Sequence, residues 1–148
     1  MKTTFLLVAG IILPILSSAS SFVPPAPQIK ATSYILLDAQ TNKVIVEYEA
    51  DERNPPASLT KIMTTYLVEQ LIQRGVVERN EKVPVSIKAW KAEGSKMFIR
   101  EGTKVDLTDL LRGVVIQSGN DASIALAEFV AGDEESFAQM MNEQAEKL

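Results

Sequence analysis

Residues 54–67 read Asn-Pro-Pro-Ala-Ser-Leu-Thr-Lys-Ile-Met-Thr-Thr-Tyr-Leu, and this abrupt passage from a turn into a helix decides the fold of the chain. Pro55 and Pro56 cannot lie inside a helix, so the helix begins at about residue 57 or 58. Beyond that point apolar residues recur at helical spacing, and Gly75 is a natural end. The apolar positions are Leu59, Ile62, Met63, Tyr66, Leu67 and Leu71, with Val68 and Ile72 widening the face. We expect a central helix surrounded by the rest of the domain.

Ser58 and Lys61 project from the same side of the first turn of this helix, because they are three residues apart. A serine hydroxyl is a weak nucleophile unless a neighbouring base takes its proton. The chain contains no histidine and no cysteine, which excludes a Ser-His-Asp triad and thiol catalysis. Lysine is then the favoured base, with tyrosine as the alternative. Burial and the positive end of the helix dipole favour the neutral amine that such a base requires. The free N–H groups of the first turn are suited to hold an oxyanion.

The same pair of residues also has a purely structural interpretation. Serine is a favoured helix N-cap, and a serine three residues before a lysine occurs by chance in many chains of this length. A catalytic interpretation of Ser58 and Lys61 therefore requires a second, independent feature.

Residues 1–21 have the pattern of a secretory signal peptide. A short opening with one lysine precedes an apolar run over residues 5–16, and small residues follow it. About a dozen apolar residues are too few for a membrane span, which needs about 20. An uncleaved anchor is the alternative, although Pro14 and the small residues favour cleavage. A proline-rich leader follows over residues 22–30, and we expect the protein to be exported.

The composition is that of an ordinary globular domain. Of the 148 residues, 46% are hydrophobic and 23% are charged, which distinguishes the chain from disordered proteins. The net charge is −4, whereas recognition of nucleic acid relies on basic patches. We therefore expect one domain over residues 31–148 and no nucleic-acid partner.

A β-hairpin is predicted before the serine helix. Residues 34–38 and 43–48 are two strand-like runs joined by a short turn. Asn42 in that turn tolerates the left-handed conformation that such a connection needs.

The chain becomes more polar after the serine helix. Residues 82–86 predict a short edge strand, because Pro84 would be costly in a central one. We expect Trp90, Met97 and Phe98 to pin a long loop to the core, with lining of a cleft as the alternative.

Three further helices are predicted in the last part of the chain. Asp106 is placed to cap the first of them. Its apolar stripe contains Leu107, Leu110, Leu111, Val114 and Val115. The second helix starts at about Ala122, and Gly132 with Asp133 ends it and caps the third.

The sequence Ser118-Gly119-Asn120 lies in the tight corner between the first two of these helices. Gly119 fits the position just after a helix, and Asn120 or Asp121 fits an N-cap. That structural interpretation explains the glycine and one capping residue, but it does not require both a serine and an asparagine. In a corner both side chains point away from the helix bodies. A hydroxyl and an amide beside Ser58 and the lysine would complete a proton path.

With both features in view, the chain resembles the low-molecular-mass penicillin-binding proteins, specifically the D-alanyl-D-alanine carboxypeptidases. Residues 56–64, Pro-Ala-Ser-Leu-Thr-Lys-Ile-Met-Thr, are similar to the nucleophile motif of that family. Residues 117–122, Gln-Ser-Gly-Asn-Asp-Ala, resemble its second motif, S-x-N. The predicted hairpin is similar to the stretch before the family's serine, so the likeness runs from about residue 31 to the end. Gly119 in the middle of the second motif fits the carboxypeptidases better than the class A β-lactamases.

The resemblance implies the fold of the serine β-lactamases and DD-peptidases. This is a mixed α/β (α+β) fold, with an antiparallel sheet covered by helices and an all-helical subdomain that holds Ser118. The implied reaction is acyl transfer on peptidoglycan stem peptides that end in D-Ala-D-Ala. Ser58 is then the nucleophile and Lys61 the base. Ser118 relays a proton to the leaving amine, and Asn120 holds the lysine and the substrate amide.

Further properties follow from the same resemblance. β-Lactam antibiotics would acylate Ser58 and leave slowly. No metal or organic cofactor is implied. The implied location is the periplasm or the outer face of the cytoplasmic membrane.

The chain departs from the family in one plain respect: the third motif, Lys-Thr-Gly, does not occur in it. In the family that strand forms one wall of the cleft and supplies the cation that receives the substrate carboxylate. The family's C-terminal domain and its membrane-binding tail, a means of peripheral attachment, do not occur in these residues either. We expect the N-terminal portion of a carboxypeptidase, with an incomplete sheet and little or no activity by itself.

Two alternatives remain open from the sequence. A related serine β-lactamase or transpeptidase would share the motifs, and turnover of a β-lactam in place of a stable adduct would distinguish it. A non-catalytic peptidoglycan-binding protein fits the absence of Lys-Thr-Gly. The retained Ser58, Lys61, Ser118 and Asn120 weigh against it.

Overall fold

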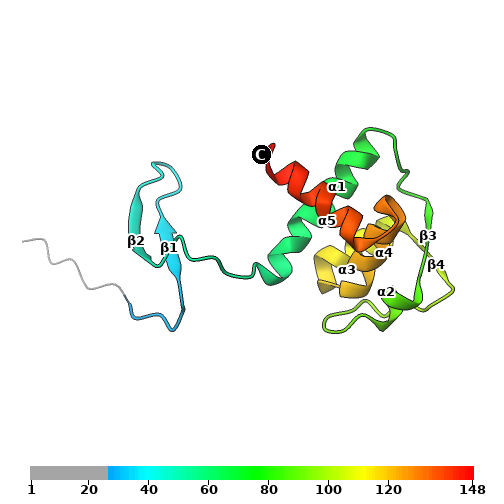
Figure 1. Ribbon diagram of the computed structural model, residues 1–148, viewed down its shortest axis with the longest axis horizontal. Coiled ribbons are helices and arrows are strands. Elements are labelled where there is room, and N and C mark those ends of the chain that lie inside the picture. The colour runs from blue at the N-terminus through cyan, green and yellow to red at the C-terminus, as the bar shows by residue number, and fades with distance from the viewer. Residues whose placement is uncertain (1–26) are drawn as a thin grey trace, which may run out of the picture. The chain divides into compact units, whose positions relative to one another are not determined.

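The computed structural model describes residues 27–148, and the chain divides into two compact units, with the boundary in the sequence between Arg53 and Asn54 (Figure 1). The predicted signal peptide and the start of the proline-rich leader lie outside the described residues. The assignment of residues 31–148 to one domain stays a prediction. None of the helices within residues 27–148 is both long and apolar enough to cross a membrane.

The first unit contains the predicted β-hairpin. Strands β1 (Tyr34–Leu37) and β2 (Val44–Tyr48) pair antiparallel, with Tyr34 opposite Tyr48. The Asp38 carboxylate accepts the backbone N–H groups of Gln40 and Thr41. Asn42 has the left-handed conformation that the sequence predicted, with φ of 55°. These local bonds close the turn and confirm the hairpin.

The second unit is mostly helical, with a small sheet at its edge (Figure 1). Its elements are η1 (Ala57–Leu59), α1 (Thr60–Gln73), β3 (Lys82–Pro84), α2 (Ile87–Lys91), β4 (Lys104–Asp106), α3 (Leu107–Gln117), α4 (Asn120–Ala131) and α5 (Glu134–Ala145). Together with the hairpin they confirm the mixed α/β class, and both sheets in the described part of the chain are antiparallel.

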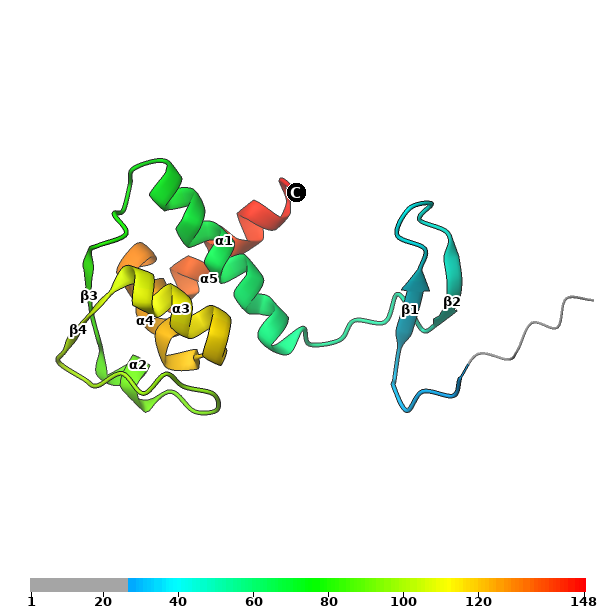
Figure 2. The same ribbon diagram turned by 180° about the vertical axis from the view of Figure 1, so that it is seen from behind.

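The serine helix begins and ends where the sequence predicted, but it is not the central helix. The 3₁₀ turn η1 follows the two prolines directly, and the chain leaves α1 through Gly75, with φ of 69°. Leu59 and Ile62 each expose 68% of their surface. Helix α1 lies against α3, α4 and α5 on one side (Figure 2). Helix α1 buries Thr64, Leu67 and Val68, while Ile62 at its start stays exposed, so its run of apolar residues did not show which positions would be covered.

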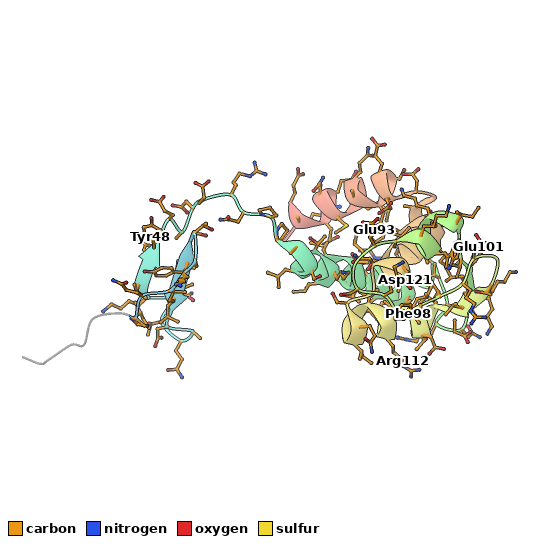
Figure 3. The ribbon with its side chains drawn as sticks, turned by 90° about the horizontal axis from the view of Figure 1, so that it is seen from below. Tyr48, Glu93, Phe98, Glu101, Arg112 and Asp121 are labelled. Carbon is orange, nitrogen blue, oxygen red and sulfur yellow. The ribbon has the colours of Figure 1, made fainter. Side chains whose placement is uncertain are left out.

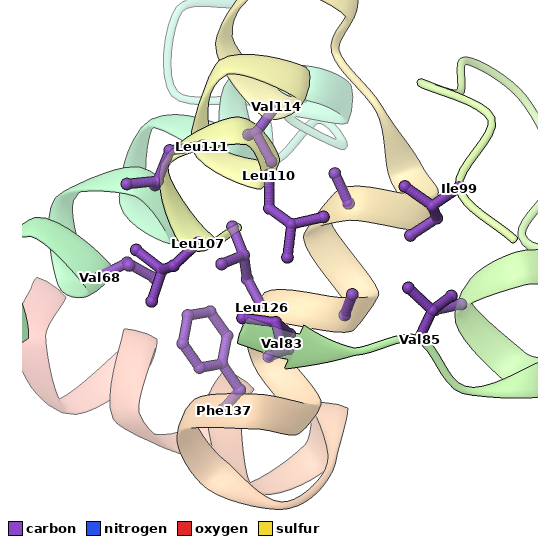
Figure 4. Close-up of a cluster of buried hydrophobic side chains, with 14 of the residues drawn as sticks. Val68, Val83, Val85, Ile99, Leu107, Leu110, Leu111, Val114, Leu126 and Phe137 are labelled. Atoms are coloured by element: carbon purple, nitrogen blue, oxygen red, sulfur yellow. The ribbon is translucent and has the colours of Figure 1, made fainter. Parts of the chain in front are cut away.

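Helix α4 is the central helix of this unit, since it contacts α1, α2, α3, α5 and β3. Ala122 and Ala125 on its buried face have no exposed surface. Their small side chains let the neighbouring elements approach closely. Larger apolar side chains from α1, α3, α5 and β3 pack with Leu126 of α4 in one cluster (Figure 4). The core includes Val68, Val83, Leu107, Leu110, Leu111, Val114, Leu126 and Phe137.

The edge strand predicted at residues 82–86 forms as β3, and its partner β4 was not predicted. Asp106 precedes α3 as expected, but its carboxylate makes no capping bond. It pairs instead with Lys82 across the two strands, with 2.9 Å between Lys82 Nζ and Asp106 Oδ2. Val115 was predicted to belong to the apolar stripe of α3, but it is 71% exposed and is not part of the core.

The segment after α2 is held by Met97, as predicted, and by Ile99, which was not predicted. Met97 packs against the core and Ile99 is buried in it. Phe98 is 82% exposed and has φ of 64°, in the left-handed region. Trp90 lies on α2 and is also exposed. The expectation that Phe98 pins this loop to the core is therefore wrong, because the left-handed residue turns its ring outward.

The packing of α3 generates a direct test. Leu110 has no exposed surface, so Leu110→Ala removes buried atoms and leaves a cavity that costs about 2–5 kcal/mol. Ile116 on the same helix is 73% exposed, and Ile116→Ala should change stability by less than about 0.5 kcal/mol. Urea unfolding followed by circular dichroism measures both. Equal losses in the two variants would contradict this core.

Candidate active site

Ser58 and Lys61 lie on the first turns of the serine helix, as predicted. Ser58 is in η1 and Lys61 is one turn later in α1, with 3.2 Å between Lys61 Nζ and Ser58 Oγ. Neither η1 nor α1 has a side-chain capping bond at its N-terminus. The interpretation of Ser58 as an N-cap is therefore wrong. Its hydroxyl is exposed and faces the amine instead.

The corner between α3 and α4 brings the second predicted pair to the same amine. Lys61 Nζ lies 3.2 Å from Ser118 Oγ and 2.6 Å from Asn120 Oδ1. Ser118 and Asn120 are 57 and 59 residues from the lysine in the sequence. The structure thus gathers all four predicted site residues around one nitrogen atom.

The backbone of this corner differs from the prediction for Gly119. Ser118 is the left-handed residue that ends α3, with φ of 52° and ψ of 38°, whereas Gly119 has an ordinary φ of −64°. Glycine is needed at 119 for space. A Cβ there would lie 2.9 Å from Asp121 Oδ1 and 3.3 Å from both the Gly113 carbonyl oxygen and the Met97 nitrogen.

Two bonds from a distant loop hold Asn120. Its Nδ2 donates to the Glu93 carbonyl over 2.6 Å, and its backbone N–H donates to the Ser95 carbonyl over 2.7 Å. Because a carbonyl only accepts, Nδ2 must face Glu93, and Oδ1 must face Lys61. Glu93 and Ser95 could not be predicted from the sequence, since their contribution is a main-chain oxygen that any residue type supplies.

Asp121 was expected as an alternative N-cap of α4, and the helix has no side-chain cap. Its carboxylate has no exposed surface and accepts the backbone N–H groups of Met97, at 3.0 Å, and Ile99, at 3.2 Å. It also accepts the N–H of Ala122 at 2.9 Å. Asp121 therefore ties the loop of residues 93–99 to the corner between α3 and α4 (Figure 3, where Glu93, Phe98 and Asp121 are labelled).

The geometry around Lys61 suits an amine that passes a proton between two hydroxyls. An ammonium has three donors, and Ser58, Ser118 and Asn120 offer three acceptors. A neutral amine keeps a donor for the amide oxygen and turns its lone pair to a hydroxyl. Since both serine oxygens lie at 3.2 Å, either hydroxyl can give its proton to the amine.

Two hollows flank the Ser58–Lys61 pair. The larger, of about 460 Å³, lies toward α4 and α5 and includes Asn120, Ser123 and Glu134 in its lining. The smaller, of about 210 Å³, lies toward α3 and includes Val114 and Ser118. Ser58 and Lys61 line both. Within residues 27–148 no three His, Cys, Asp or Glu side chains are grouped as metal ligands.

The left-handed Ser118 gives a matched pair of variants. Ser118→Gly and Ser118→Ala remove the same hydroxyl, but alanine keeps the steric cost of a left-handed backbone, about 1–2 kcal/mol, and glycine does not. Glycine loses more entropy on folding, about 0.5–1 kcal/mol. We expect the glycine variant to be the more stable by about 0.5–1 kcal/mol in urea unfolding. An alanine variant of equal or higher stability would contradict the left-handed corner.

Comparison with known proteins identifies a matching protein family. Residues 20–148 match the family Peptidase_S11, D-alanyl-D-alanine carboxypeptidase. The chain is 46% identical over 129 residues to D-alanyl-D-alanine carboxypeptidase DacC of Escherichia coli, covering 83% of this chain and 32% of that protein.

Two solved structures are also similar. The carboxypeptidase DacD of Francisella tularensis is 37% identical, with a TM-score of 0.74, covering 89% of this chain and 32% of that one. Penicillin binding protein 5 of Haemophilus influenzae is 38% identical, with a TM-score of 0.74, covering 84% and 37%. The chain thus spans about a third of the length of these relatives, and it belongs to the D-alanyl-D-alanine carboxypeptidase family.

Proposed function

We propose that this chain carries the nucleophile and proton-transfer groups of a serine D-alanyl-D-alanine carboxypeptidase. The observation that supports the proposal best is the position of Lys61 Nζ, within hydrogen-bond reach of two serine hydroxyls and one amide oxygen. A serine, a base that reaches it and a group that orients the base are the parts that nucleophilic catalysis needs.

In the proposed reaction Ser58 Oγ attacks the carbonyl carbon of the penultimate D-alanine, while Lys61 takes the hydroxyl proton. The tetrahedral intermediate then expels the terminal D-alanine, whose amine nitrogen receives a proton through Ser118. An ester on Ser58 remains. Water attacks this ester, its proton passes to the same amine, and the free acid leaves as Ser58 regains its hydrogen.

Asn120 has a proposed double role. Its Oδ1 accepts from Lys61 and holds the amine between the two serines. Its amide has two N–H donors, of which the Glu93 carbonyl takes one. We assign the other donor to a carbonyl of the substrate backbone.

The proposed substrates are peptidoglycan stem peptides that end in D-Ala-D-Ala, and the proposed inhibitors are β-lactams, which present a strained amide to the same serine. The name of the penicillin binding protein from Haemophilus influenzae supports the second of these. We further propose export to the periplasm or to the outer face of the cytoplasmic membrane, on the pattern of residues 1–21.

Labelling with a fluorescent penicillin tests the nucleophile. Because the chain spans about a third of its relatives, it is assayed alone and joined to the remaining part of the DacC protein of Escherichia coli. We expect a stable label on the joined protein and none on the chain alone. Ser58→Ala should abolish the label, and Ser136→Ala, on α5 and outside the site, should not. A label that survives in Ser58→Ala would refute Ser58 as nucleophile, and a folded joined protein that never labels would refute the proposed function.

Lys61→Met tests the base in the same joined protein. Methionine has a similar length but cannot take a proton, so the acylation rate should fall by about 10²–10⁴-fold. Lys88, whose amine pairs with Glu134, provides the control variant Lys88→Met. An acylation rate within about twofold of the parent in Lys61→Met would show that another group is the base.

A further inference from the structure

We propose that Asp121 is a positioning residue for the site: its buried carboxylate holds the loop of residues 93–99, and that loop fixes the amide of Asn120 toward Lys61. The mechanistic meaning of this inference rests on the proposed function. The structural part of it can be tested without any catalysis.

Backbone N–H groups surround the carboxylate of Asp121. None of the ion pairs within the described part of the chain includes it, and its side chain is completely buried. A buried carboxylate is costly unless hydrogen bonds compensate it. The donors come from Met97, Ile99 and Ala122. Two of the three belong to the loop, so the loop must stay in place for the carboxylate to stay satisfied.

The loop takes up a strained conformation to make these bonds. Met97 and Ile99 both donate to the one carboxylate, and Phe98 between them has φ of 64°. Backbone N–H groups that converge on one anion from either side of a left-handed residue form a concave anion-binding nest. A bulky residue in the left-handed region is an outlier that persists only where its surroundings determine it. Here the hydrogen bonds from Met97 and Ile99 to the buried carboxylate of Asp121 hold Phe98 in this conformation.

The same loop meets Asn120 at three points. The carbonyls of Glu93 and Ser95 accept its side-chain and backbone N–H groups. Between them, a Cβ on Gly94 would lie only 2.9 Å from Asn120 Nδ2. The loop thus both hydrogen-bonds the amide and limits its space. Asp121 is the adjacent residue on α4, so it anchors the loop to the helix that carries Asn120.

The orientation of the Asn120 amide decides whether Lys61 Nζ faces a hydrogen-bond acceptor or two donors. With Nδ2 on Glu93, the oxygen of Asn120 accepts from Lys61 at 2.6 Å. A reversed amide would turn two N–H donors toward an amine that also donates. If the loop moved away, the carbonyl that prevents this reversal would be lost. Asp121 would therefore act on the amine through the loop and Asn120, without touching the substrate.

The test uses Asp121→Asn in this chain, which keeps the shape but places an N–H₂ against the loop N–H groups. Asp109→Asn is the control, since Asp109 is an exposed carboxylate on α3 that pairs with Arg112. Nuclear magnetic resonance follows solvent exchange of the Asn120 side-chain amide and the nitrogen shift of Lys61 Nζ, while circular dichroism follows unfolding. We expect exchange of the Asn120 amide to rise by about tenfold or more in Asp121→Asn, with a shifted Lys61 signal. Neither should change in Asp109→Asn.

A second measurement needs no variant and covers the case in which Asp121→Asn does not fold. In the unaltered chain, the amides of Met97 and Ile99 and the side-chain amide of Asn120 should open to exchange together as denaturant is added, as one cooperative unit. Exchange of the Asn120 amide while Met97 and Ile99 remain protected would overturn the proposal. So would a folded Asp121→Asn variant with unchanged Asn120 and Lys61 signals. Failure of penicillin labelling would bear on the proposed function alone, because these signals do not depend on acylation.

Discussion

The contact between the Lys61 amine and the Asn120 amide oxygen is the constraint on which the site depends. It joins segments 59 residues apart, and a lysine side chain loses up to about 2 kcal/mol of rotamer entropy when it is fixed. Three acceptors converging on one nitrogen offset that cost only if the first turn of α1 and the α3–α4 corner are held at a fixed separation. The close packing of α4 against its neighbours, made easy by Ala122 and Ala125, provides this separation. The core therefore determines the geometry around Lys61 by positioning the first turn of α1 and the α3–α4 corner.

Most helix boundaries and both motifs could be predicted from the sequence because their determinants are local. Pro55 and Pro56 prevent a helix before residue 57, and Gly75 ends it within a few residues. The Asp133 carboxylate accepts the N–H of Ser136 and caps α5. Each of these effects acts over one helical turn, so no knowledge of the tertiary structure is needed. The gathering of the site residues followed from the family resemblance, since their spacing alone gives no distance.

The predictions that the structure contradicts have a common physical origin. One residue type can serve two purposes, and which of the two it serves depends on groups far along the chain. Asp106 and Asp121 both look like helix caps, yet one pairs with Lys82 and the other accepts N–H groups of the loop of residues 93–99. Gly119 looks like the residue that ends a helix through a positive φ, but it is required for space beside Asp121. Burial is equally non-local, so the apolar faces of α1 could not show which stripe would be covered. Prediction from the sequence fails here where the partner of a side chain lies far along the chain.

Backbone strain in the helical unit is concentrated around this site. Within residues 54–148, the non-glycine residues with positive φ are Ala57, Phe98 and Ser118. Ala57 precedes Ser58, the proposed nucleophile, Ser118 belongs to the candidate site, and Phe98 lies in the loop whose carbonyls accept from Asn120. Each costs about 1–2 kcal/mol relative to an ordinary conformation, and glycine would relieve it at any of the three. A fold selected for stability alone would not place all the strained residues of this unit in the segments that build one site. Their positions are better explained if these residues adopt unfavourable backbone conformations in order to maintain the geometry around Lys61. Strain of this kind is typical of functional sites.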